Sequence, residues 1–563
     1  MEIFESPEFN IIRYLSNSYI FKSTSKEPDF LNSIKERILL NTNDIIYKKN
    51  IPERNISFLS RIENSIGNFI CNQISEYDYI IYIYNHKTNK IKKVNYFISP
   101  HYYKKLPNDT TNCFNIIINE LKNSKSHNFR SRNIDSIYNQ LDKYFLDKNL
   151  GICNMLLDNY DGPFPISVAM LPLDNGKEEP GVGRTRKIQR SRAVALLEAY
   201  ERYSGLEPRG KKTINHTEDL KSKKVNMNSL ILHNNPFLIS HGIKNSNFTY
   251  NDLLDNEISW VKCLNLNTFQ TLLIPEQYAY YGINISNHKE KAINIAYEIS
   301  NGCSVGNNYL EVVYYGLMEV IERDSFLCSW YFNTPKDKIS LKNASTSIKN
   351  LIQQFTSYYN DYKLELFYLY NEFNIPVVLA TVTLKESSTK KMNFMCAAAA
   401  DINIEDAIEK SIHEIGGILF GLNKKFIDRY HELEAIRKNN LDVKTMEDHT
   451  LVYGLPEHRT YIQQKMNYEN IYDYDKELTP KIFYKEVQKL IKKISTTKDI
   501  LLVDQTPLIS KKIDLKVGKI IVPGLLPMTF GKYNIRVSEN RYHELCHFYS
   551  KDLIIDLNPH PFP

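Results

Sequence analysis

Two short segments of the chain share the spacing E-x-x-E-R. The first comprises Glu198, Glu201 and Arg202, and the second comprises Glu319, Glu322 and Arg323. In a helix, residues i, i+3 and i+4 lie on one face, so each segment would point two carboxylates and one guanidinium the same way. The neighbours of Glu198 are apolar on every side, which is typical of a buried helix. Buried carboxylates need a cation, which an arginine, a lysine or a metal ion supplies.

The second segment continues as a polar stripe. Helical steps back from Glu322 give Glu319, Tyr315, Glu311 and Asn307, which follow a glycine-rich turn in the sequence SNGCSVGN. Acids on one stripe repel each other unless a hard cation lies among them, and Mg²⁺ prefers carboxylate oxygen. For a single motif the alternative is a pair of surface salt bridges, contributing about 0.3–0.5 kcal/mol each. Two copies, one of them extended, favour a cation site.

A glycine-containing basic stretch precedes the first motif. Gly181-Val182-Gly183 is followed by arginine and lysine, and we expect a flexible turn here that opens a helix over Ser191–Ser204. A G-x-G sequence before a helix can bring backbone N–H groups to a phosphate. The stretch matches neither the G-x-x-x-x-G-K-[ST] loop nor the dinucleotide fingerprint G-x-G-x-x-G, and alone it is common in loops.

Composition excludes several classes of protein. The 563 residues suffice for two to four domains. The net charge of +6, without a long Lys/Arg block, predicts no nucleic-acid binding. Eight scattered cysteines without a C-x-x-C pair predict free thiols and no structural zinc. The start, MEIFESPEFNIIRYL, is not a signal peptide, and no apolar run approaches the roughly 18 residues of a membrane span. We therefore expect a cytoplasmic protein that does not enter a membrane.

The pattern of elements predicts two domains of α+β or α/β character. Residues 1–155 are expected to form a smaller α+β domain for docking or structure, with a hairpin near Tyr77–Ser99 and two later helices. From residue 156 strands alternate with helices, which favours a layered domain of mixed sheets and helices. Expected strands are Ile166–Leu171, Ile258–Leu264, Thr271–Pro275, Leu364–Tyr370, Val377–Thr383, Phe394–Ala400, Ile500–Asp504 and Lys519–Val522, and further helices are Ile404–Phe420, Lys476–Thr496 and Ser538–Ser550.

The chain ends in Asn558-Pro-His-Pro-Phe-Pro563, with prolines at alternate positions. Such a segment favours extended polyproline II geometry and lacks N–H donors at each proline. A solvated tail is the default for a terminus. Stiffness would, however, allow accurate placement of the Pro563 carboxylate. We expect His560 to be an ordinary exposed histidine.

These motifs together resemble the YcaO family, and specifically its azoline-forming cyclodehydratases of thiazole/oxazole-modified peptide biosynthesis. The similarity covers roughly residues 156–563 and includes the G-x-G stretch, EAYER at Glu198–Arg202, SNGCSVGN at Ser300–Asn307, the acid series that follows, and Ile521–Leu525. The terminal P-x-P-x-P is typical of the azoline-forming branch. The resemblance implies a YcaO-type ATP-binding domain of mixed sheets and helices.

The resemblance also implies roles for individual residues. The Mg²⁺ ligands would be Glu198, Glu311, Glu319 and Glu322. The ATP contacts would be Gly183, Glu201, Arg202, Ser304, Asn307 and Arg323. A Cys, Ser or Thr of a ribosomally made precursor peptide would attack the preceding carbonyl, whose oxygen ATP then phosphorylates, and loss of phosphate would leave a thiazoline or oxazoline. The Pro563 carboxylate is the candidate proton acceptor, and His560 is the alternative.

The chain departs from the family pattern at two positions. Val194 replaces a serine that often precedes the first glutamate, and Tyr315 replaces a frequent glutamine. Each change weakens one nucleotide contact and leaves the acids intact. An arginine of the C-terminal half should also contact phosphate, with Arg536 and Arg541 as candidates.

The expected partners follow from the same resemblance. Residues 1–155 are too short, and too poor in paired cysteines, for the complete activating-enzyme-like domain of fused relatives, of which they would be a reduced module. We therefore expect a separate leader-binding partner protein besides the precursor peptide, with a flavin dehydrogenase as a further candidate and a homodimer as the default assembly. Three alternatives stay open at this point: a YcaO enzyme that makes thioamides or amidines, a catalytically silent docking scaffold, and an unrelated α/β protein with two salt-bridged helices.

Overall fold

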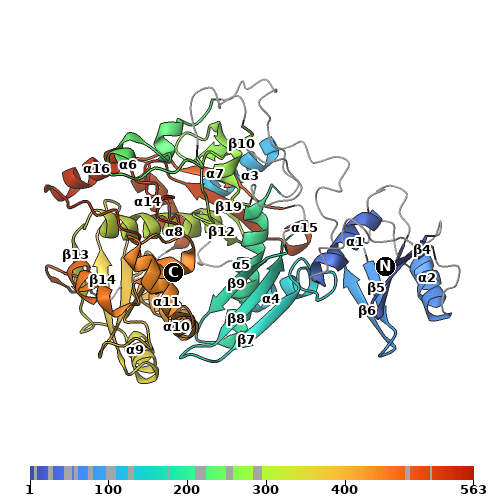
Figure 1. Cartoon of the computed structure of the whole chain (residues 1–563). Helices are drawn as coiled ribbons and strands as arrows, with labels where there is room; N and C mark the ends of the chain where they lie inside the picture. The colour runs from blue at the N-terminus through green and yellow to red at the C-terminus, as the bar shows by residue number, and fades with distance from the viewer. Residues whose placement is uncertain are drawn as a thin grey trace.

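The computed structural model shows a mixed α/β chain with an N-terminal sheet set apart from a larger body (Figure 1). The structure describes the chain except for residues 6–8, 23–29, 43–53, 56–60, 74–79, 97–109, 124–131, 174–175, 209–222, 249–257, 283–293, 476–481 and 508–509. The α+β and α/β fold class expected from the sequence is confirmed.

The N-terminal sheet has the strand order β4-β1-β2-β3-β5-β6. Its strands are β1 (Glu2–Glu5), β2 (Phe9–Tyr14), β3 (Asn17–Lys22), β4 (Arg54–Asn55), β5 (Ile80–Asn85) and β6 (Lys90–Asn95). The helices of this region are α1 (Phe30–Asn41), α2 (Arg61–Gln73), α3 (Thr110–Asn123) and α4 (Ile134–Tyr144). Phe30, Ile34 and Ile38 of α1 pack on the sheet in a small core of their own.

A three-stranded antiparallel sheet follows, formed by β7 (Met155–Asn159), β8 (Ile166–Pro172) and β9 (Glu178–Arg184). Helix α5 (Ile188–Leu206) lies on it and carries the first motif. The packing is so close that a Cβ on Gly183 would lie 1.8 Å from the carbonyl oxygen of Ser191, and one on Gly181 would lie 2.4 Å from that of Ala195. The expected flexible turn is therefore wrong: the two glycines belong to a strand and allow a helix to approach it.

Two five-stranded sheets form the main body. The first, in order, is β11 (Thr271–Pro275), β10 (Trp260–Asn265), β18 (Leu501–Asp504), β19 (Lys516–Ile521) and β12 (Cys303–Gly306). The second is β16 (Phe394–Ala400), β15 (Val377–Leu384), β14 (Tyr362–Leu369), β13 (Lys336–Ile339) and β17 (Ile471–Tyr472). The remaining helices are α6 (Pro236–Ser240), α7 (Glu276–Ala279), α9 (Thr346–Tyr358), α10 (Ile404–Asp428), α11 (Tyr430–Lys438), α12 (Met446–Val452), α13 (Arg459–Lys465), α14 (Phe483–Ile494), α15 (Ser510–Ile513) and α16 (Glu539–Tyr549).

Helix α8 (Tyr309–Tyr331) crosses the body and carries the second motif (Figure 1). It packs against β12 and β19 of one sheet and against β15 and β16 of the other. It is apolar on most sides, as expected of a helix buried between layers. The side chain of Asn308 caps its start by accepting the N–H of Glu311. Gly316 lets it approach β19, since a Cβ there would lie 2.6 Å from Ile520.

Most strands and helices expected from residue 156 onward are present at nearly the expected bounds. The strands Thr271–Pro275 and Phe394–Ala400 are observed unchanged. The N-terminal hairpin is present as β5 and β6, although part of the predicted range lies outside the described residues, as does the start of the expected helix Lys476–Thr496. The division into domains at residue 155 stays a prediction. Within the described residues, every helix is too short or too polar to cross a membrane.

The close contact of β9 with α5 leads to a prediction. Gly183→Ala should destabilise the fold by about 3 kcal/mol or more, because the new methyl group would collide with helix backbone that cannot move aside. The urea midpoint of unfolding measures this loss. Gly421→Ala on α10 is the matched control: a Cβ there meets no atom within 4 Å, and the exchange should stabilise by about 0.5–1 kcal/mol. Equal midpoints for the two variants would contradict the packing argument.

Candidate active site

The two E-x-x-E-R motifs face each other across the gap between α5 and α8. Burial raises the pKa of Glu201 well above its usual range, and the next largest cause is the charge of Glu319 on the opposite helix. Burial also raises the pKa of Glu319, against the opposing effects of Arg323, Lys519 and Arg202. The structure thus gathers like charges from both motifs into one place, where a cation would stabilise them.

Glu322 lies at the far end of the same stripe. Burial raises the pKa of its carboxyl to about 8, opposed by Arg323 and reinforced by Glu319. Its Oε2 accepts the N–H of Ala400, at the end of β16, at 3.3 Å. The side chains of Glu322 and Glu319 remain 17% and 23% exposed, so a ligand in solvent can reach them.

Glu198 has protein partners for both of its oxygens. Its Oε1 accepts hydrogen bonds from Arg202 at 2.8 and 3.1 Å, and its Oε2 accepts the backbone N–H of Val182 at 2.8 Å. Arg202 also pairs with Glu179. The backbone donor at the centre of the G-x-G stretch therefore binds a carboxylate of the chain itself. A nucleotide contact at Gly183 stays a prediction.

A second polar group lies at the start of α8. Glu311 is fully buried, and its carboxylate accepts the backbone N–H of Asn307 at 3.0 Å and the side-chain amide of Asn307 at 2.9 Å. The amide oxygen of Asn307 is buried, and among the described residues it has no hydrogen-bond partner. Ser304 is buried nearby on β12 and donates its hydroxyl to the carbonyl of Val312 at 2.7 Å. An amide oxygen without a donor, beside a carboxylate, suits a metal or a nucleotide hydroxyl.

The predicted metal ligands are spread along the site. Glu311 precedes Glu322 by three helical turns, or about 16 Å. In the part of the chain that the structure describes, no three His, Cys, Asp or Glu side chains converge into a ready-made cage. Mg²⁺ in nucleotide sites is usually held by one or two carboxylates together with phosphates and water, so this arrangement fits it. The assignment of Glu198, Glu311, Glu319 and Glu322 as ligands stays a prediction.

Arg323 connects the acids to the end of the chain. Its Nη2 lies 3.2 Å from Oε1 of Glu319, and its guanidinium lies 5.1 Å from the ring centre of Phe562. Its Nε is buried and has no hydrogen-bond partner within the described residues. The ring of Phe562 also packs on Phe326 of α8, at 4.8 Å between centres. Phe562, the residue before Pro563, is therefore held beside an arginine of the acid site, and the role of the Pro563 carboxylate stays a prediction.

The expectation of an exposed His560 is wrong, because this residue is fully buried. Burial holds its pKa well below the usual range, and burial lowers that of His449 to about 4, so both rings are neutral. His449 accepts the N–H of Gly531 at Nε2 and donates from Nδ1 to the carbonyl of His560, each at 2.8 Å. His560 donates to the carbonyl of Thr529 at 2.9 Å.

The rest of the tail is fixed through its carbonyl groups. Tyr453 donates its hydroxyl to the carbonyl of Pro559, and Trp330 donates its indole N–H to that of Asn558 at 2.9 Å. Proline has no backbone N–H to donate, so its backbone can form hydrogen bonds only by accepting them at the carbonyl oxygen. The tail is thus a buried part of the fold, in contrast to a solvated terminus.

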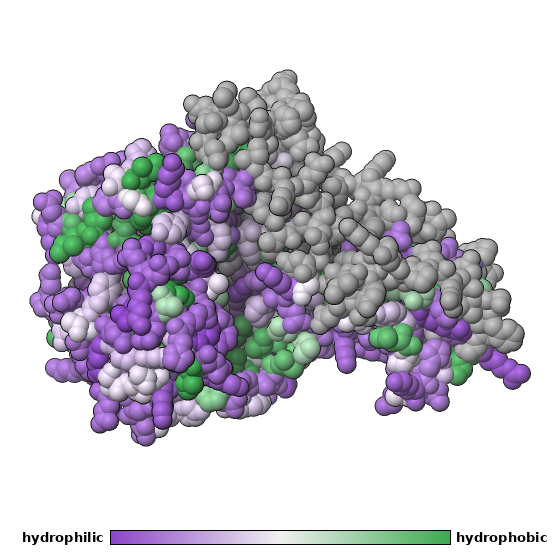
Figure 2. Space-filling view, in the orientation of Figure 1, coloured by the Kyte–Doolittle hydropathy of each residue, from purple (hydrophilic) through white to green (hydrophobic). Residues whose placement is uncertain are grey.

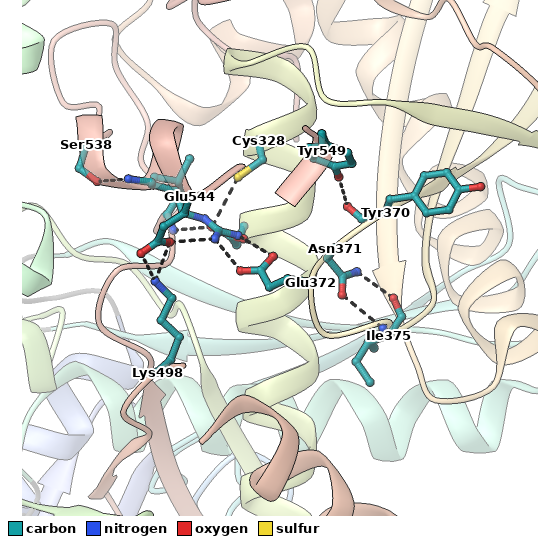
Figure 3. A network of polar contacts seen from close by, with 12 residues as sticks. Cys328, Tyr370, Asn371, Glu372, Ile375, Lys498, Ser538, Glu544 and Tyr549 are labelled. Carbon is teal, nitrogen blue, oxygen red and sulfur yellow. Dashed lines mark hydrogen bonds and ion pairs between the residues drawn. The ribbon is translucent and has the colours of Figure 1, made fainter. Parts of the chain in front are cut away.

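The candidate arginines of the C-terminal half have other partners. Arg541 is buried in a network that joins α16 to α8 and to the turn before Ile375, with ion pairs to Asp324, Glu372 and Glu544 (Figure 3). Asp324 in turn accepts the N–H of Leu526 at 2.8 Å. This network holds α8 and the loop after β19 together. Arg536 is also buried and pairs with Glu298.

Two lysines near the acid stripe could not be identified from the sequence. Lys519 projects from β19, and its charge acts on Glu319. Lys410 of α10 lies 2.7 Å from Asp401 and acts electrostatically on Tyr315. Both are isolated lysines of a lysine-rich sequence, so only the folded structure associates them with the acids.

Comparison with known proteins places the chain in a family. A sequence model described as the YcaO cyclodehydratase, which binds ATP and Mg²⁺, matches residues 182–526. This match covers more than half of the chain and includes both helices that carry the acids. The chain therefore belongs to the YcaO family. ATP and Mg²⁺ are the cofactors of that family, as expected from the sequence.

Individual relatives are distant. An uncharacterised protein of Methanothermobacter thermautotrophicus is 28% identical over 177 residues, which are 31% of this chain and 40% of that protein. A heterocyclase solved with substrate and cofactor shares the fold with a TM-score of 0.68 at 17% identity, over 97% of this chain and 76% of that one. The YcaO protein of Methanopyrus kandleri, solved with AMPPCP and Mg²⁺, gives a TM-score of 0.52 at 16% identity, over 74% of this chain and 97% of that one.

The raised pKa of Glu322 predicts how stability depends on pH. A glutamate in the unfolded chain titrates near pH 4.3, whereas the folded carboxyl retains its proton up to about 8. Between these values the folded state binds more protons, so stability falls as pH rises. Between about pH 5 and pH 8 the melting temperature of Glu322→Gln should therefore fall by less than that of the wild type. The difference between the two falls should be about 2 °C or more. Calorimetry without Mg²⁺ measures the difference, and parallel curves would contradict it.

The histidine contacts predict how firmly the tail is held. His449→Leu removes two hydrogen bonds and should speed amide exchange in the C-terminal peptide about tenfold or more. Hydrogen exchange with mass spectrometry measures this, and residues of the N-terminal sheet serve as the internal reference. His543→Leu on the exposed face of α16 is the control and should leave tail exchange unchanged. Tail exchange that is equal in the two variants would show that His449 does not hold the tail.

Proposed function

We propose that the chain is an ATP-dependent cyclodehydratase that converts Cys, Ser or Thr residues of a ribosomally made precursor peptide to thiazoline or oxazoline. The observation that carries the proposal is the contact of the P-x-P-x-P tail with the acid site through Phe562 and Arg323. Family membership supports ATP use, and the buried tail supports the azoline-forming branch. The fold shared with a heterocyclase that was solved with its substrate adds support.

The reaction joins a side chain to the preceding carbonyl. The thiol sulfur or hydroxyl oxygen would attack the amide carbon and lose its proton, the former carbonyl oxygen would accept a phosphoryl group from ATP, and ADP would leave. Loss of that oxygen as phosphate, with the amide proton, forms the C=N bond of the ring. When bound, MgATP supplies the phosphoryl group and neutralises its developing charge.

The chain's own groups would prepare this reaction. The carboxylates of Glu198, Glu319 and Glu322 would hold the metal on the phosphates, with Glu311 and Asn307 at the other end of the stripe. The guanidiniums of Arg202 and Arg323 are each held by a glutamate of the same helix and would face phosphate oxygens. The Pro563 carboxylate would accept the proton of the attacking group, because the buried tail fixes the end of the chain near Arg323.

The proposed enzyme would work together with other proteins, because residues 1–155 are too short for a complete leader-binding domain. We expect a separate leader-binding protein to present the precursor, since ordering a long flexible peptide at the site costs free energy that a second contact offsets. A flavin dehydrogenase that oxidises the azoline ring, a homodimeric state and a cytoplasmic location remain parts of this proposal.

Reconstitution with precursor and partner tests the function. Glu319→Gln should lower ADP formation and ring formation at least about a hundredfold, because one charge of the facing pair is lost. Each ring lowers the peptide mass by one water, which mass spectrometry detects. Glu434→Gln is the matched control: it removes an acid from another i, i+4 ion pair, with Lys438 on α11, and should be silent. Ring formation by Glu319→Gln at the wild-type rate would refute the proposal.

A further inference from the structure

A cavity lies beside α8, next to the acid stripe. Its wall includes Val320 and Arg323 of α8, Lys519 of β19, and the loop from Val522 to Pro527. Successive helix residues are turned by about 100°, which places Val320 roughly a quarter turn from Glu319, with Arg323 between the two directions. Arg323 therefore borders both the acid stripe and the cavity.

Two buried cations line the cavity and share one carboxylate. Lys519 and Arg536 are 1% and 4% exposed, and both pair with Glu298, the lysine at 2.7 Å. Lys519 gives a second ammonium hydrogen to the carbonyl of Ile299, which leaves it one more. Arg536 gives its Nε–H and one Nη2–H to the carbonyls of Ile231 and Leu230. Its guanidinium also retains N–H groups beyond these contacts. Lys519 and Arg536 with their shared carboxylate therefore have spare donors and one excess positive charge.

The same wall carries a spare acceptor. The side chain of Asn301 is 7% exposed, and its amide nitrogen donates to the carbonyl of Met528 at 2.8 Å. Its amide oxygen is buried, and within the described residues nothing donates to it. A buried acceptor without a donor costs about 1–3 kcal/mol, so a ligand with an N–H group would recover this loss.

Donors beside an acceptor complement a peptide amide, which presents a C=O and an N–H. A phosphate has no N–H to offer to Asn301, and apolar groups of Leu230, Ile521, Pro523 and Leu525 also line the cavity. A few polar groups among apolar ones are typical of ligand sites and suit a peptide amide beside an apolar side chain. The loop is held by Asp324, so the wall is formed before a ligand arrives.

We propose that this cavity binds the acceptor amide of the peptide substrate, with its C=O toward Lys519 and Arg536 and its N–H toward Asn301. The inference rests on the proposed function and deepens it, since it places the phosphoryl acceptor beside Arg323, which also adjoins the proposed nucleotide site. The donors that bind the carbonyl would also stabilise negative charge on its oxygen when the nucleophile attacks.

Disulfide tethering tests the proposal without turnover. Val320→Cys introduces a thiol into the cavity, and Val168→Cys introduces one on β8 at a similar intermediate exposure. Each variant is equilibrated in a redox buffer with acetyl-Gly-Cys-Gly-amide and with cysteamine, and intact-mass spectrometry measures the mixed disulfides. The wild type gives the background of native thiols. We expect about a tenfold preference for the peptide over cysteamine at Val320→Cys and none at Val168→Cys.

The expected preference should depend on the amide partner. Adding Asn301→Leu to Val320→Cys should abolish it, while the rise in melting temperature with AMPPCP and Mg²⁺ stays as in Val320→Cys alone, which shows a folded nucleotide site. Equal peptide preference at the two cysteines, or a preference that survives Asn301→Leu, would overturn the proposal. Tethering as expected, together with a wild type that forms no rings, would retain the peptide site and reject the proposed reaction.

Discussion

The repulsion between carboxylates on two facing helices is the constraint on which the rest of the structure depends. Glu201 and Glu319 are brought together from α5 and α8, although separation would lower their energy in the absence of a cation. The fold enforces the approach through small residues: glycines in β9 admit α5, and Gly316 admits β19 to α8. Stability obtained from apolar packing elsewhere thus holds together a site that is complete only with a bound cation.

Two further parts of the structure meet this site at Arg323: the C-terminal tail, and β19 with the loop after it. The tail reaches Arg323 from one direction, and the wall formed by β19 and the loop after it reaches it from another. The Arg541 network connects these parts, because Asp324 lies one residue after Arg323 and binds both α16 and the loop. One arginine therefore adjoins the acid stripe, the tail and the cavity. The described surface seen in Figure 2 is mainly hydrophilic, with smaller hydrophobic patches.

The sequence predicts the parts of this arrangement that local spacing determines. Helical periodicity identified α5, α8 and the stripe from Asn307 to Glu322, and alternation identified most central strands. Neighbours from distant segments were not predictable. Lys519 belongs to no motif, and the motif SNGCSVGN does not show that Asn301 would share a cavity with it. The burial of His560 arises from α12 and the loop near Thr529. The G-x-G stretch was misinterpreted because glycine permits both flexibility and close packing, and only the partner helix decides between them.

The pairing of β12 with β19 has a consequence for synthesis of the chain. Cys303 lies opposite Lys519, so the strand that leads into α8 waits for a partner more than two hundred residues later. At typical elongation rates this interval lasts about 10–40 s. Until then the face of α8 that packs on β19 is uncovered, which exposes the nascent protein to aggregation and to chaperone binding. The sheet beneath α8 can therefore be completed only after most of the chain has been made.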